Sequence, residues 1–70
     1  MEKSTIAQRI RAFRKLKGYT QNELAEVLGV SIAILGAIER GTRKPDAKII
    51  REISTVLGIE PEELNVTEGR

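Results

Sequence analysis

Residues 20–41 read TQNELAEVLGVSIAILGAIERG and carry the start and end signals of two short helices. Thr20, with Glu23 three residues later, has the pattern of a capping box, which marks the beginning of a helix. A glycine suited to left-handed backbone ends this first segment, and Ser31 is a good N-cap for the next one. The predicted helices cover residues 20–28 and 32–40.

Two short helices joined by a tight, glycine-containing turn are typical of a helix-turn-helix, whose second helix fits the major groove of DNA. In residues 32–40, Leu35 and Ile38 are expected to face the core. At 100° per residue, the positions that then face outward are Ala33, Gly36, Ala37 and Arg40, with Ile32 and Ile34 on the flanks. DNA binding is therefore the leading hypothesis.

The flanking sequence predicts three further helices and no strand. A Thr5–Gln8 capping pair starts a helix over about residues 5–17, with an apolar face of Ile6, Ile10, Phe13 and Leu16. Asp46 caps a fourth helix that ends before Gly58, with Ile49, Ile50, Ile53, Val56 and Leu57 on one face. Pro61 suits the first position of a brief fifth helix around residues 61–65. We expect one all-α domain over residues 1–70, with a core of about 5–65 and a polar tail at 66–70.

Composition excludes several classes of chemistry. The chain has 70 residues, near the lower limit for a domain held together by its core alone. It has no cysteine for a disulfide or thiolate and no histidine, the commonest metal ligand. Glu62 and Glu63 are adjacent on a short helix and imply no pocket, and no glycine-rich phosphate motif is present. We expect no enzyme activity, no cofactor and no metal.

Charge is unevenly distributed along the chain. The formal net charge is +2, but residues 1–44 carry +5 and residues 45–70 carry −3. This asymmetry indicates a front that faces a polyanion and a neutral or acidic back. No apolar signal-peptide core follows the N-terminus and no run approaches transmembrane length, so a cytoplasmic protein without a membrane partner is expected.

Residues 10–31, IRAFRKLKGYTQNELAEVLGVS, followed by Ile38-Glu39-Arg40-Gly41 and Pro45, resemble the Cro/C1-type (Xre family) helix-turn-helix repressors. The resemblance extends over about residues 5–65. It is carried by the combination of Thr-Gln-x-Glu-Leu-Ala, Gly-Val-Ser and Ile-Glu-Arg-Gly at these separations. It implies a compact five-helix bundle of the lambda-repressor-like DNA-binding type, with the helix-turn-helix at the second and third helices.

The resemblance also implies roles for three polar residues. The residue matching Gln21 contacts the DNA backbone and can support base reading, beside helix N-terminal N–H groups that favour a phosphate. The residues matching Arg14 and Glu39 commonly form a partly buried ion pair. We expect this pair to join the first predicted helix to the third and to orient the third, without contacting DNA.

The outward face of residues 32–40 departs from the family pattern. Relatives often carry hydrogen-bonding side chains at the positions of Ile32, Ala33 and Ala37, where this chain has none. In one interpretation, Gly36 and the alanines allow a close approach to DNA, and Ile32 and Ala33 touch thymine methyl groups. In the other, the apolar face binds another protein. Ile34 is equally consistent with a peripheral core position.

Phosphate contacts are expected around the third helix. The candidates are Ser31, Arg40, Thr42, Arg43 and Lys44. Ser31 is equally consistent with a role as a cap alone. Most of four further cations are expected to be solvated and to act through the long-range field alone: Arg9, Arg11, Lys15 and Lys17.

One short helix buries too little surface for tight sequence-specific binding, so a twofold homodimer on palindromic double-stranded DNA is expected, with half-sites ~34 Å apart. The family implies dimer contacts near the fifth helix, where Leu64 and Val66 are available; Ile59 fits the monomer core better. The expected function is a transcriptional regulator, a repressor because the predicted helices leave no segment for an activation domain. The alternative is a protein-interaction module, such as an antitoxin, that keeps the fold but reads bases weakly.

Overall fold

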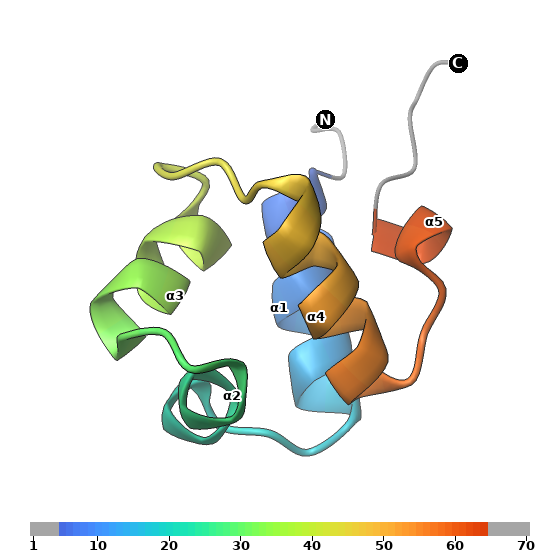
Figure 1. The fold of residues 1–70 in the computed structure, drawn as a ribbon, viewed down its shortest axis with the longest axis horizontal. Helices are drawn as coiled ribbons and strands as arrows, with labels where there is room; N and C mark the ends of the chain where they lie inside the picture. Colours follow the sequence, from blue (N-terminus) through green and yellow to red (C-terminus); the bar gives the residue numbers. More distant parts are fainter. Residues whose placement is uncertain (1–4, 65–70) are drawn as a thin grey trace.

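The five helices of the computed structural model, which describes residues 5–64, begin and end within about one residue of the predicted positions. They are α1 (Ile6–Leu16), α2 (Gln21–Leu28), α3 (Ile32–Arg40), α4 (Ala47–Leu57) and α5 (Pro61–Leu64). Residues 5–64 contain no strand, and the all-α prediction is confirmed. Figure 1 shows α1 and α4 near the centre, with α2 and α3 on one side and α5 on the other.

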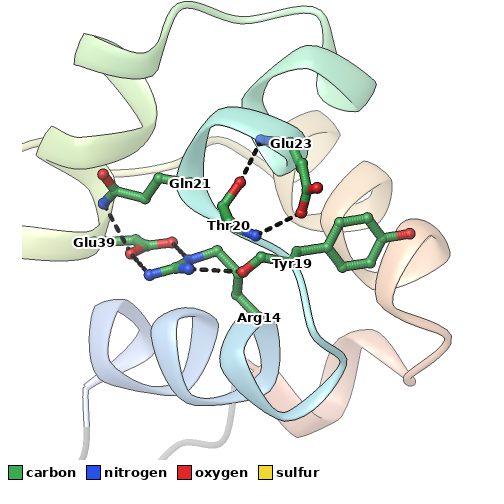
Figure 2. Close-up of polar contacts among 6 residues, drawn as sticks. All are labelled: Arg14, Tyr19, Thr20, Gln21, Glu23 and Glu39. Atoms are coloured by element: carbon green, nitrogen blue, oxygen red, sulfur yellow. Dashed lines mark hydrogen bonds and ion pairs between the residues drawn. The ribbon is translucent and has the colours of Figure 1, made fainter.

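Side-chain caps explain where four of these helices begin. Thr5 and Gln8 form a reciprocal capping box at α1, with hydrogen bonds of 3.1 and 3.2 Å. Thr20 and Glu23 form the same arrangement at α2, where the two hydrogen bonds are 3.0 and 2.9 Å (Figure 2). Single caps start the other two helices: Ser31 Oγ accepts from the Ile34 amide and Asp46 Oδ1 from the Ile49 amide. Each cap typically stabilises its helix by about 1 kcal/mol.

The turn between α2 and α3 depends on Gly29. Its φ of +76° lies in the left-handed region, which glycine adopts without steric strain. The two helices meet at 113°, the geometry of a helix-turn-helix. Among residues 5–64, no single helix is long and apolar enough to cross a membrane. Within this part of the chain, only α2 and α3 taken together reach the length and hydropathy of a membrane span, and this pair is sharply bent.

The core is formed by apolar side chains from all five helices. Its fully buried members are Ile10, Leu24, Leu35, Ile38, Ile53, Leu57 and Leu64, with Ala25 beside them. Helix α1 contacts α3, α4 and α5, α2 contacts α3 and α4, and α4 also contacts α5. Every helix therefore packs against at least two others. This packing holds α3 at the edge of the domain with one face buried and the other accessible.

Two orientation predictions are wrong. Leu16 was expected on the buried face of α1 but is 73% exposed. Each step of three residues falls about 60° short of a full turn, so two such steps from Ile10 carry the side chain off the buried face. Gly36 was expected to face outward but is buried, because side chains from α2 and α3 cover it.

The predicted dimer contact at Leu64 also needs correction. Leu64 is 1% exposed and belongs to the monomer core, because α5 packs against both α1 and α4. Its apolar surface is therefore buried within its own chain. Ile59 is half-buried and packs against the same core, as expected. Val66, the other predicted contact, lies outside the described residues.

The contrasting orientations of Ile10 and Leu16 on α1 give a direct test of this packing. We predict that Ile10→Val lowers the free energy of unfolding by about 0.5–1.5 kcal/mol, because it leaves a void in the core. Leu16→Ala removes a larger group but changes that free energy by less than about 0.5 kcal/mol, because the side chain is in solvent. Urea unfolding followed by circular dichroism measures both. A greater loss of stability for Leu16→Ala would show that α1 is rotated differently.

Candidate nucleic-acid interface

A buried ion pair joins α1 to α3. Arg14 Nε and Nη2 donate to the two carboxylate oxygens of Glu39, at 2.7 and 3.1 Å. Both residues are only 7% exposed. Arg14 Nη1 also donates to the main-chain oxygen of Tyr19 at 2.8 Å, which fixes the segment leading into α2. The predicted pair is confirmed, and its two-pronged geometry is the strong form of an arginine–carboxylate contact.

Gln21 at the start of α2 is part of the same network. Its Nε2 donates to Glu39 Oε1 at 3.0 Å, and Figure 2 shows the amide oxygen directed away from that carboxylate. A carboxylate only accepts hydrogen bonds, so the NH₂ group must face Glu39. One N–H is thereby used, and the second N–H and the carbonyl oxygen remain available. The half-buried Gln21 thus combines a structural contact with unused hydrogen-bonding capacity.

An open hollow of about 900 Å³ lies beside this network. Its lining residues are Arg11, Arg14, Tyr19, Thr20, Gln21, Glu39 and Arg40. The lining contains three arginines and one carboxylate, and that carboxylate is already paired with Arg14, so the hollow is cationic. The start of α2 adds main-chain N–H groups that have no partner within the helix. The arrangement can bind an anion such as a phosphate.

Sequence reasoning missed Arg11 as a candidate for this site. Arg11 belongs to a group of four cations, most of which were expected to act only through the long-range field, and the structure places it in the lining of the hollow with Arg14. The signal was its position three residues before Arg14, because residues at that spacing share one side of a helix. That signal is informative only once Arg14 has been located.

The accessible face of α3 has few hydrogen-bonding groups. Ile32 is 44% exposed, Ala33 is exposed and Ala37 is half-buried. Ile34 is half-buried and packs against the core, in agreement with its peripheral core interpretation. Ser31 is exposed, and its Oγ acts as the cap of α3, which leaves its hydroxyl hydrogen free to donate.

The loop after α3 is fastened to the end of that helix. The main-chain amides of Thr42 and Arg43 both donate to the Ala37 oxygen, at 3.0 and 3.2 Å. The Thr42 hydroxyl donates to the same oxygen, so its single hydrogen is not free for a phosphate. Arg43 and Lys44 are exposed and line, with Arg40, a second hollow of about 640 Å³ against the start of α1.

These features define the class of protein. Two short helices meet at 113°, the second is accessible along one face, and two cationic hollows adjoin its C-terminal end, where Arg40 lines both. This is the architecture of a DNA-binding helix-turn-helix domain. Among residues 5–64, no group of acidic side chains is placed to hold a metal ion.

Comparison with known proteins identifies the family. The helix-turn-helix family matches residues 10–64, and the chain belongs to this family of Cro/C1-type transcriptional regulators. It is 56% identical over 64 residues to YazB of Bacillus subtilis (strain 168), an uncharacterized HTH-type transcriptional regulator. That match covers 91% of this chain and 93% of YazB. The predicted family is confirmed.

Two further relatives have known structures. The chain is similar to SinR, the master regulator for biofilm formation, in a crystal structure with DNA: TM-score 0.82, 39% identity, 87% of this chain and 98% of that one. The restriction-modification controller protein C.AhdI from Aeromonas hydrophila gives a TM-score of 0.80 at 39% identity, covering 84% of this chain and 89% of C.AhdI. The match to the complete SinR of Bacillus subtilis covers 50% of its length.

The buried ion pair predicts an asymmetric response to substitution. Arg14→Met leaves the Glu39 carboxylate buried without its main partner, so we expect a loss of about 3–5 kcal/mol in the free energy of unfolding. The double variant Arg14→Met/Glu39→Met removes both charges, and we expect it to recover most of that loss. Thermal and urea unfolding measure both. If the double variant were as unstable as the single one, the penalty would not come from an unpaired buried charge.

Proposed function

We propose that this protein is a transcriptional repressor that binds a palindromic DNA operator as a dimer. The main observation behind this proposal is the accessible face of α3 together with two cationic hollows at the C-terminal end of that helix. In the proposed complex α3 lies in the major groove, and the hollows near its C-terminal end contact the phosphate backbone. The family and the likeness to the DNA-bound SinR structure support the same arrangement.

Phosphate contacts are proposed for the polar and cationic groups that have unused donors. They are Arg11, Gln21, Ser31, Arg40, Arg43 and Lys44. Thr42 is instead assigned a role in fixing the loop, because its hydroxyl hydrogen is bonded to the Ala37 oxygen. Guanidinium groups bind phosphate oxygens with two parallel N–H groups, so the arginines are expected to contribute most.

Base recognition is proposed to depend on apolar contacts. Ile32 and Ala33 are exposed on α3, and Ala37 adds a small side chain along the same helix. Such side chains cannot hydrogen-bond a base edge, but they can pack against the methyl group of thymine. We therefore propose an operator with thymines at the positions facing Ile32 and Ala33, and sequence-dependent DNA deformability as a second source of specificity.

A dimer is proposed because α3 has only nine residues and offers a small contact area. Two copies related by a twofold axis would place their α3 helices in successive major grooves, about 34 Å apart. Leu64 is omitted from the proposed interface because it fills the monomer core. Val66 stays a predicted contact.

A protein-interaction module is the second candidate function. It is favoured by the exposure of Ile32 and of Val27 on α2, which is 56% exposed, because exposed apolar residues can mark a contact surface. This candidate predicts no preferred DNA sequence. Selection of bound duplexes from a random pool therefore separates it from the proposed repressor.

The salt dependence of DNA binding tests the phosphate contacts. We predict a log–log slope of affinity against salt of about −0.9 for each neutralised phosphate, with ~6–10 contacts for a dimer. Arg43→Ala should weaken binding to all duplexes and flatten the slope by about 0.9 for each phosphate that is no longer neutralised. Fluorescence anisotropy on the selected duplex measures both, and the stoichiometry of the titration reports the dimer.

Arg51→Ala is the matched control for Arg43→Ala. Arg51 is an exposed arginine that lines the hollow between α2 and α4, away from α3. Its removal changes the net charge equally but should leave the slope almost unchanged. Equal effects of the two variants would mean that the slope reports the overall field rather than a phosphate bound at the loop.

Ala33→Glu tests whether α3 enters the groove. The exposed position allows the fold to accept the larger side chain, but the carboxylate would face the strongly negative DNA. We predict loss of detectable binding with an unchanged circular dichroism spectrum. Thr55→Glu on α4 introduces the same charge outside α3 and should retain binding. Normal binding by Ala33→Glu would exclude α3 from the groove.

A further inference from the structure

Gly36 occupies a position in α3 that the fold itself does not require to be glycine. It lies in the helix interior, and its φ is not among the positive values found for other glycines. Glycine in a helix interior is less stable than alanine there because it loses more backbone entropy on folding. Gly36 therefore lowers the stability of α3 at its centre, and the surroundings of Gly36 indicate why a glycine is present there.

Side chains alone occupy the space where a Cβ of residue 36 would lie. That Cβ would be 3.2 Å from Arg40 Nη1 and 3.9 Å from Gln21 Nε2. Among the described residues outside α3's own backbone, no other atom lies within 4 Å of that point. A methyl group at 3.2 Å is closer than an ordinary contact, so the Arg40 guanidinium would have to move by a few tenths of an ångström. Gly36 thus leaves room for this guanidinium in its present position.

Arg40 rests over Gly36, and no acceptor among residues 5–64 holds its guanidinium. Helix side chains lean towards the N-terminus, so Arg40 extends back one turn along α3 and meets the residue four positions earlier. Within residues 5–64, no hydrogen bond is formed by its guanidinium. The neighbouring Glu39 carboxylate is already bonded to Arg14 and Gln21 and forms no ion pair with Arg40. The guanidinium therefore keeps its donors free.

We propose that Gly36 is a positioning residue that seats the Arg40 guanidinium beside the Gln21 amide, so that both side chains hold one DNA phosphate together. This inference rests on the proposed function. Gln21 contributes the N–H that Glu39 does not use, and Arg40 contributes its planar pair of N–H groups. A single phosphate then bridges the start of α2 and the end of α3, which fixes α3 relative to the DNA backbone.

Gly36→Ala tests the proposal because stability and binding should change in opposite directions. We expect the melting temperature to rise by about 2–8 °C, since alanine is the better helix former. DNA affinity should fall about tenfold, as for the loss of a hydrogen bond to a charged group, with a flatter salt slope. Thr55→Ala on α4 is the control: it raises helix propensity at an exposed position and should leave binding unchanged.

The double variant Gly36→Ala/Arg40→Ala shows whether Gly36 acts through Arg40. With Arg40 absent, Gly36→Ala should cause no further decrease in affinity, so the effects should be non-additive. Additive decreases in affinity, or a Gly36→Ala variant with wild-type affinity and salt slope, would show that Gly36 does not position Arg40. The proposed function is tested on the wild-type protein alone, and it fails if that protein binds no duplex preferentially. The role of Gly36 is tested by comparing the variants with the wild type, so the two failures can be told apart.

Discussion

The orientation of α3 depends on one buried ion pair. The Glu39 carboxylate receives three hydrogen bonds, two from Arg14 and one from Gln21, and Arg14 also binds the Tyr19 carbonyl. These contacts connect α1, the segment before α2, the start of α2 and the end of α3. A buried carboxylate without partners would be very costly, so the four segments can only take relative positions that satisfy it. The ion pair therefore specifies geometry more than it adds stability.

The same pair determines the electrostatics of the site. Because the charge of Glu39 is paired with Arg14 and its carboxylate also accepts from Gln21, it forms no ion pair with Arg40, and the hollow at the start of α2 keeps its cationic character. Arg11 adds a further positive charge from α1. A surface that binds a polyanion needs cations that are near one another but are not already paired within the protein. Saturation of the one acidic residue in the hollow provides this condition.

The sequence was sufficient for features set by local chemistry and insufficient for those set by contacts between helices. Thr5, Thr20, Ser31 and Asp46 marked the helix starts correctly because a cap bonds to an amide three residues away. The 25-residue separation of Arg14 and Glu39 could be anticipated only from the family resemblance. Burial of Gly36, the position of Arg11 and the packing of Leu64 each depend on a second helix, which helical periodicity does not describe. Leu16 was misplaced because its spacing drifts from the buried face.

The apolar face of α3 makes accurate positioning essential to the proposed recognition. Hydrogen bonds to bases are directional, but contacts of Ile32 and Ala33 with thymine methyl groups are not, so they discriminate only when α3 is held in a fixed register. That register must then come from the phosphate contacts beside the helix. Gln21 is fixed by Glu39, and Gly36 leaves room for the Arg40 guanidinium beside it. A protein that reads bases through small apolar side chains has reason to keep a destabilising glycine where a phosphate-binding arginine must rest.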